Sequence, residues 1–117
     1  MSGLVSYRAG LAAEEAVARR YLDAGRIMAA TRWRGASGEI DLIMRDGAAI
    51  VFIEVKKAAT HAEAALRLTS RQMARIYASA AEFLAGEPAG QATESRFDVA
   101  LVDSYGRIEV LENAFAG

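Results

Sequence analysis

The chain has 117 residues, of which 53% are hydrophobic and 25% charged, and its formal net charge is -1. This composition is ordinary for a globular protein, and the near-neutral charge excludes a general electrostatic attraction to polyanions. No apolar run approaches the roughly 20 residues that cross a bilayer, so we expect no membrane insertion. One domain over residues 1–117 is expected, because this length supports one hydrophobic core but not two.

The chain contains no cysteine, and residues 1–9 lack the apolar segment of a secretory signal. A disulfide framework and a thiolate metal cluster are therefore excluded, and a lone histidine, His61, gives little support for zinc. We expect a cytoplasmic location.

The first predicted element is a helix over residues 8–24, where the strong helix formers Ala, Leu, Glu and Arg dominate. Gly25 follows at the position where helices commonly end. Spacings of three and four predict which side chains face the core. The predicted stripe is Leu11, Glu15, Ala18 and Leu22.

A strand is predicted over residues 26–33, followed by a loop over 35–38. Residues 39–44 and 49–56 are two β-rich runs joined through Asp46-Gly47, a dipeptide typical of tight turns. This segment therefore predicts a β-hairpin.

Residues 58–68 show no clean periodicity and predict a loop. A second helix is predicted over residues 69–85, because Gln72 stands three residues after Thr69 in the spacing of a capping box. Gly86 follows as a stop signal.

Strands are predicted over residues 97–102 and 107–111. Arg96 and Asp98 are interpreted as a structural pair on the first of them. Strands and helices in this order predict an α/β fold.

The register of the predicted hairpin decides which side chains meet. If its loop is Asp46-Gly47, Asp41 pairs with Phe52 and Glu39 pairs with Glu54. Alternate residues of a strand share a face. Four side chains then emerge on one side, namely Glu39, Asp41, Glu54 and Lys56.

Two carboxylates and an ammonium group on one face suggest a metal-dependent site. The strand around Glu54 is apolar enough to be covered on both sides, and an unpaired carboxylate there is costly. Mg²⁺ accepts one or two carboxylates and takes its other ligands from water and substrate phosphates. Asp41 and Glu54 would hold the ion, and Lys56 would position the attacking water or offset charge on phosphorus. The alternative is a salt bridge between Glu54 and Lys56 on a half-solvated face.

Three sequence blocks carry a resemblance to known proteins: residues 38–43 (GEIDLI), 51–56 (VFIEVK) and 96–99 (RFDV). In order and spacing they resemble the YraN family of bacterial proteins, which is related to archaeal Holliday-junction resolvases. The resemblance covers about residues 10–115. It implies a restriction-endonuclease-like three-layer fold of the PD-(D/E)xK class, with a mixed central β-sheet flanked by helices. It also implies a metal-binding acid at Asp41, a second acid at Glu54 and a catalytic lysine at Lys56.

The resemblance implies one more acid on the first helix. Counting back from residues 18–22 places it at Glu15, whereas counting from Gly10 favours Glu14. We take Glu15, which also belongs to the predicted inward stripe. Its alternative role is an exposed ion pair with Arg19, four residues later.

Nucleic-acid contacts are predicted on the second helix and just before it. Gln72 matches a glutamine near the metal site of related resolvases, although it also suits the capping box. Arg67, Arg71 and Arg75 could form a basic patch, and the alternative is a solvated helix face. Many family members have an arginine where this chain has Ala58, which weakens the expected phosphate contacts.

The leading hypothesis is an endonuclease that uses Mg²⁺ or Mn²⁺ to hydrolyse branched or structured DNA. One rival is a non-catalytic nucleic-acid-binding module of the same fold, and another is a protein-interaction subunit. A shared fold does not by itself establish a shared activity. A homodimer would suit a two-strand cut, by analogy.

Overall fold

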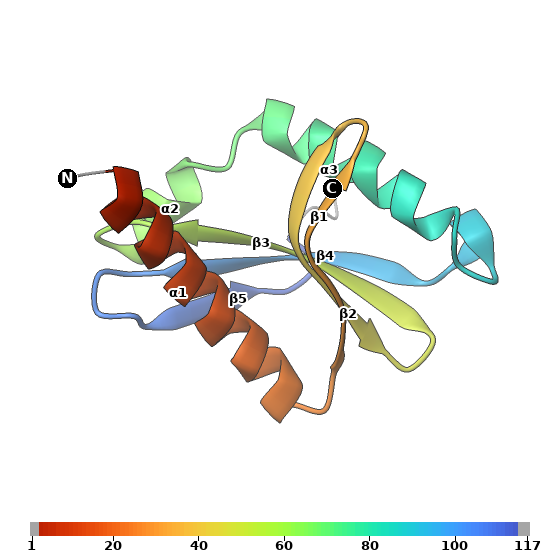
Figure 1. Cartoon of the computed structure of the whole chain (residues 1–117), viewed down its shortest axis with the longest axis horizontal. Helices are drawn as coiled ribbons and strands as arrows, with labels where there is room; N and C mark the ends of the chain where they lie inside the picture. The colour runs from red at the N-terminus through yellow and green to blue at the C-terminus, as the bar shows by residue number, and fades with distance from the viewer. Residues whose placement is uncertain (1–2, 115–117) are drawn as a thin grey trace.

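A computed structural model describes residues 3–114 (Figure 1). The helices are α1 (Gly3–Asp23), α2 (His61–Leu66) and α3 (Ser70–Leu84), with a short 3₁₀ turn, η1 (Gly90–Ala92). The strands are β1 (Ile27–Gly35), β2 (Gly38–Asp46), β3 (Ala49–Lys57), β4 (Ser95–Val102) and β5 (Ile108–Leu111). They form one sheet in the order β1-β2-β3-β4-β5, in which β3 and β4 are parallel and the other neighbours antiparallel. The predicted α/β fold with a mixed sheet is confirmed.

Helices cover both faces of the sheet (Figure 1). On one face, Val17 of α1 packs in a core with Ile53 of β3. On the other, Ile76 of α3 packs in a core with Phe52 of β3. The central strand β3 is therefore buried on both sides, which explains its continuous apolar run. Within residues 3–114, no helix is long and apolar enough to span a membrane.

The buried face of α1 differs from the predicted stripe. Among residues 8–23 of this helix, the buried side chains are Ala13, Val17, Ala18 and Tyr21. Of the predicted stripe, Ala18 is buried, but Glu15 is exposed and Leu22 is 46% exposed, so the prediction was wrong at these two positions. Alanines surround this helix and define no clear apolar face. Its rotation is fixed instead by the Tyr21 hydroxyl, which donates to the buried Asp98 carboxylate at 2.7 Å.

The β2–β3 hairpin is confirmed, but its register is not the predicted one. The loop is Gly47–Ala48, one residue further along the chain, with a glycine φ of 63° at its first position. A two-residue turn favours glycine there, because a side chain resists positive φ. If the observed register is continued by one pair, Asp41 lies opposite Glu54. The prediction had paired Asp41 with Phe52, and Glu54 with Glu39. The partners shift by two residues, so each side chain keeps its predicted face.

Strands β2 and β3 part from each other after the pair Leu42–Ile53. Beyond this pair, β2 stays bonded to β1 as far as Gly38, and β3 stays bonded to β4 as far as Lys57. Leu42 belongs to the core under α1 but Ile40 to the core under α3. Residues two apart in a flat strand share a face, so β2 bends between them. The bend separates the two strands at one end of the sheet.

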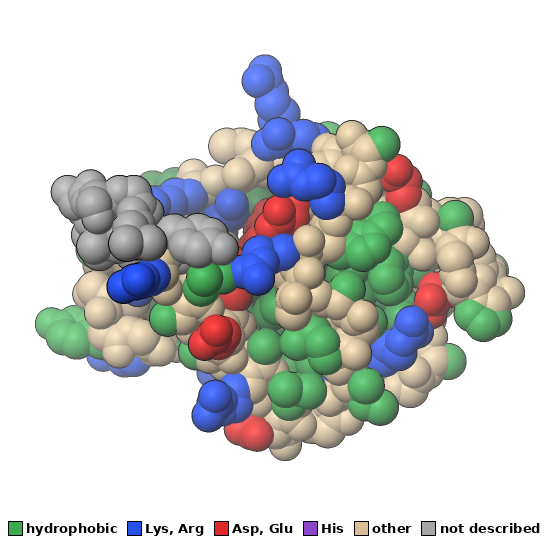
Figure 2. All heavy atoms as spheres, in the orientation of Figure 1, with side chains coloured by type: hydrophobic (Ala, Val, Ile, Leu, Met, Phe, Trp, Pro, Cys, Tyr) green, Lys and Arg blue, Asp and Glu red, His purple; other side chains and the backbone are tan. Residues whose placement is uncertain are grey.

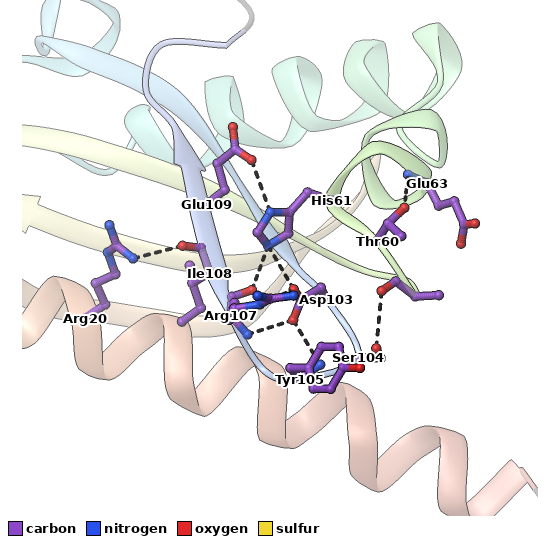
Figure 3. A network of polar contacts seen from close by, with 11 residues as sticks. Arg20, Thr60, His61, Glu63, Asp103, Ser104, Tyr105, Arg107, Ile108 and Glu109 are labelled. Carbon is purple, nitrogen blue, oxygen red and sulfur yellow. Dashed lines mark hydrogen bonds and ion pairs between the residues drawn. The ribbon is translucent and has the colours of Figure 1, made fainter.

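The predicted loop over residues 58–68 was wrong, because it contains α2. Thr60 caps this helix by accepting a hydrogen bond from the Glu63 amide at 3.1 Å. A threonine followed three residues later by glutamate is a helix-start signal that could have revealed α2. Figure 3 shows how α2 is held against β5: the Nδ1 atom of His61 lies 3.2 Å from the Glu109 carboxylate.

The bond between Tyr21 and Asp98 predicts a stability effect. Tyr21→Phe should destabilise the fold by about 1–3 kcal/mol, because a buried carboxylate loses one of its donors. Urea unfolding would measure this change. Tyr105→Phe is the control, since Tyr105 is 82% exposed. Equal stability of the two variants would contradict this account of α1.

Candidate active site

A cavity of about 460 Å³ opens where β2 and β3 part. Side chains from α1, the β1–β2 hairpin, β3 and α3 line it. The charged and amide side chains among them are Glu14, Arg34, Glu39, Asp41, Glu54, Lys56, Lys57, Gln72 and Arg75. Figure 2 shows acidic side chains in a hollow on this face, with basic side chains gathered around it.

The three groups predicted on the hairpin meet in this cavity. The Asp41 carboxylate accepts a hydrogen bond from the Val55 amide at 2.8 Å, taking the place of a strand partner. The Glu54 side chain is hydrogen-bonded to Asp41 and is 11% exposed. The Nζ atom of Lys56 lies 4.0 Å from Glu54 Oε2. Two carboxyl groups and one ammonium group thus share a partly buried space.

The crowding of acids changes their protonation. Burial, and then the hydrogen bond and negative charge of Asp41, raise the pKa of Glu54, while Lys56 opposes the shift. Burial and the charge of Asp41 also raise the pKa of Glu14 to about 7. Neighbouring carboxylates that cannot all ionise favour a bound proton or a bound cation. The site is therefore suited to a positive ligand.

The helix-one acid in the cavity is Glu14, and the chosen residue, Glu15, lies outside it. Glu15 lines a separate depression together with Arg19 and Leu22. Glu14 lines the cavity together with Ala13, which belongs to the buried face of α1. The count along the chain from Gly10, which favoured Glu14 as the helix-one acid, therefore identified the residue that lines the cavity.

Of the three arginines predicted to contact nucleic acid, Arg75 lines the cavity, and Arg67 and Arg71 lie exposed outside it. Gln72 also lines the cavity. Its Oε1 atom accepts a hydrogen bond from the Thr69 amide at 3.2 Å, so the predicted capping box is confirmed. The first two turns of α3 therefore bring both an amide and a cation to the cavity wall.

Sequence reasoning missed two cations at the cavity. Arg34 lies near the end of the β1–β2 hairpin and forms a 3.3 Å ion pair with Glu39. Lys57 ends β3, where strand alternation would turn it away from Lys56. No local pattern marks Arg34, because its position depends on how the hairpin bends.

The third sequence block, residues 96–99, is structural. Asp98 is buried and accepts hydrogen bonds from Tyr21, from Arg96 Nε at 3.1 Å and from the Asn113 amide at 3.0 Å. The predicted pairing of Arg96 with Asp98 is confirmed. These donors satisfy the hydrogen-bonding capacity of the buried carboxylate.

The donor atoms at the cavity fit a hard divalent cation. Among residues 3–114, no three acidic or histidine side chains lie close enough together to hold a metal ion by themselves. Asp41 and Glu54 nevertheless present carboxylate oxygens from adjacent strands, the donor type that Mg²⁺ prefers. Such an ion commonly takes one or two carboxylates and completes its coordination with water and substrate phosphate.

Comparison with known proteins places this chain in a family. Residues 13–102 match the family described as "Uncharacterised protein family UPF0102". A UPF0102 protein of Cereibacter sphaeroides (strain ATCC 17025) is 70% identical over 116 residues, covering 99% of both chains. One from Ruegeria pomeroyi is 55% identical over 97% of this chain and 92% of its own. The chain belongs to the UPF0102 family, the YraN proteins, as its motifs predicted.

The raised pKa values predict how stability depends on pH. In the folded state the pKa values of Glu14 and Glu54 lie above the ordinary 4.5, and that of Glu14 reaches about 7. The folded state therefore binds more protons than the unfolded state over that pH range. The stability of the metal-free protein should therefore fall as the pH rises from 4.5 to about 7 and beyond. Glu54→Gln should flatten the fall, measured by urea unfolding across pH. Glu15→Gln is the exposed control, and an unchanged slope in Glu54→Gln would refute the assignment.

Proposed function

We propose that this protein is a divalent-metal-dependent endonuclease that hydrolyses DNA. The observation that carries the proposal is the meeting of Asp41, Glu54 and Lys56 in a cavity with cations at its edge. Carboxylates that hold a metal and a lysine that faces the reacting phosphate are the groups phosphodiester hydrolysis needs.

The arrangement of elements supports a restriction-endonuclease-like fold for this proposal. A mixed sheet is covered by helices on both faces, and Asp41 lies on β2 with Glu54 and Lys56 on the adjacent β3. This is the order of acids and lysine that the resemblance to YraN proteins and resolvases implies. The fold and the site therefore favour the same class of protein.

Each residue has a role that follows from its place. Asp41 and Glu54 would hold Mg²⁺ or Mn²⁺, which when bound acidifies a water and neutralises phosphate charge. The Val55 amide donates to one oxygen of Asp41 and so fixes this side chain at the cavity wall. Lys56, 16% exposed, keeps its ammonium group beside Glu54, where it can orient water or offset charge on phosphorus. Glu14, whose pKa is raised to about 7, can accept or hold a proton near neutral pH.

The edge of the cavity supports a phosphate-containing substrate. Arg34 from the hairpin and Arg75 from α3 lie at the cavity, while the whole chain has a net charge of -1. The positive charge that could attract DNA is therefore concentrated beside the carboxylates of the cavity. Attraction of a DNA backbone to this edge would bring a scissile phosphate toward the carboxylates.

Substitution of the central residues tests the activity. Asp41→Asn, Glu54→Gln and Lys56→Gln should each lower metal-dependent cleavage by about 100-fold or more, because each removes charge from the reacting centre. Cleavage of branched and linear DNA would be followed in Mg²⁺ and in Mn²⁺. Asp46→Asn, an exposed carboxylate at the hairpin turn, is the matched control. Turnover by Asp41→Asn equal to that of the native protein would reject the proposal.

The salt dependence of DNA binding tests the basic edge. Arg75→Ala should reduce the slope of log affinity against log salt concentration by about 1, because one phosphate contact is lost. Arg67→Ala, an exposed arginine outside the cavity, should leave the slope nearly unchanged. Fluorescence anisotropy of labelled branched DNA measures both. Equal slopes for the two variants would show that the backbone lies elsewhere.

A non-catalytic nucleic-acid-binding module is the second candidate. Two observations favour it: within residues 3–114 no set of three acidic or histidine side chains forms a ready metal site, and Asp41 and Glu54 are hydrogen-bonded to each other. It predicts salt-dependent DNA binding that Arg75→Ala weakens, with no cleavage in either metal.

A further inference from the structure

We propose that Ser79 and Glu82 of α3 are positioning residues, which hold the β1–β2 hairpin away from β3 and so place Asp41 in the cavity. The effect on metal binding rests on the proposed function, but the geometric part does not. Neither residue lines the cavity, so both would act through the strand that carries Asp41.

Glu82 holds the tip of the hairpin. Its carboxylate accepts hydrogen bonds from two successive backbone amides, Ala36 at 3.0 Å and Ser37 at 3.3 Å. The preceding residue, Gly35, lies so close that a Cβ atom there would stand 2.5 Å from Glu82 Oε2. A side chain at this position would force the Glu82 carboxylate to shift from where it holds the tip. The tip and α3 are thus fitted to each other.

Ser79 holds the start of β2. Its side chain is fully buried, and its hydroxyl donates to the Gly38 carbonyl at 2.9 Å. Ser79 and Glu82 are three residues apart on α3, and Arg75 is four residues before Ser79, so all three share one face of the helix. That face lies against the hairpin, which bends toward α3 (Figure 1).

The hairpin needs such support because its bend is strained. Arg32 has φ 45°, a left-handed conformation that residues with side chains rarely adopt. The pairs on either side of it in the β1–β2 register, Thr31–Leu42 and Trp33–Ile40, place Arg32 opposite Asp41. Strained backbone persists only where surrounding contacts enforce it. The contacts from Ser79 and Glu82 supply that enforcement beyond the bend.

Two consequences follow for the site. Asp41 lies between the bend and the held end of β2, so its 2.8 Å bond to the Val55 amide depends on where that end is fixed. Arg34 is on the same end and Arg75 is on α3, so the contacts also set the separation between these cations across the cavity. Ser79 and Glu82 therefore control both the metal-binding acid and the phosphate-facing edge.

The test combines three variants with two measurements. Glu82→Ala and Ser79→Ala remove the contacts, and Glu94→Gln is the control, an exposed carboxylate outside α3. Amide hydrogen exchange is measured at Val55 relative to Phe52, because Phe52 lies in the middle of β3 and reports global unfolding. Calorimetric titration with Mn²⁺ alone measures metal affinity. Ser79→Ala keeps a strong helix former in α3, so the helix should remain intact in this variant.

We expect faster exchange at Val55 but not at Phe52 in Glu82→Ala and Ser79→Ala, with about tenfold weaker Mn²⁺ binding, as when a supporting group of a metal ligand is lost. Glu94→Gln should match the native protein in both measurements. Unchanged exchange at Val55, or exchange that rises equally at Phe52, overturns the proposal. If the native protein binds no Mn²⁺, the proposed function fails, while the ratio of exchange at Val55 and Phe52 still decides the positioning role.

Discussion

The site depends on one hydrogen bond that replaces another. Where β2 leaves β3, the Val55 amide loses the partner that a continuing strand would have offered. A buried or half-buried amide must be satisfied, and here the Asp41 carboxylate accepts from it at 2.8 Å. The same contact fixes the orientation of Asp41, brings it against Glu54 and leaves a cavity between the separated strands. The candidate site therefore begins at the point where β2 and β3 stop pairing.

The pKa of Asp103, a buried carboxylate outside the cavity, shifts in the opposite direction to that of Glu54. Burial acts to raise the pKa of Asp103, but hydrogen bonds from the backbone and side chain of Arg107 and from the Tyr105 amide prevail and lower it. That carboxylate is stabilised as an anion within a network of polar contacts (Figure 3). At Glu54, burial and then the hydrogen bond and negative charge of Asp41 raise the pKa, so the ionised form is disfavoured. Acids of this kind lower the stability of the ligand-free fold, and a cation would relieve the cost.

The polar face of α3 has several tasks in a short length of helix. Gln72 caps the helix and lines the cavity, Arg75 brings a cation to its edge, and Ser79 and Glu82 contact the β1–β2 hairpin. Their spacing of three to four residues places them along one side of the helix. The adjoining side supplies apolar residues such as Ile76 and Ala80 to the core. One amphipathic helix thus joins the core to the geometry of the site.

The sequence by itself determined the features that depend on local chemistry. These were the β2–β3 hairpin, the capped helix after Thr69, the strands, the burial of β3 and the shared face of Asp41, Glu54 and Lys56. Strand alternation is a local property, so even a register that was wrong by two residues kept these side chains together. Tertiary structure decided the rest. The rotation of α1, and hence Glu14 in place of Glu15, follows from the bond of Tyr21 to Asp98, which lie 77 residues apart in the chain. The entry of Arg34 into the site follows from the bend of the hairpin against α3, and no short stretch of sequence encodes a contact between segments so far apart.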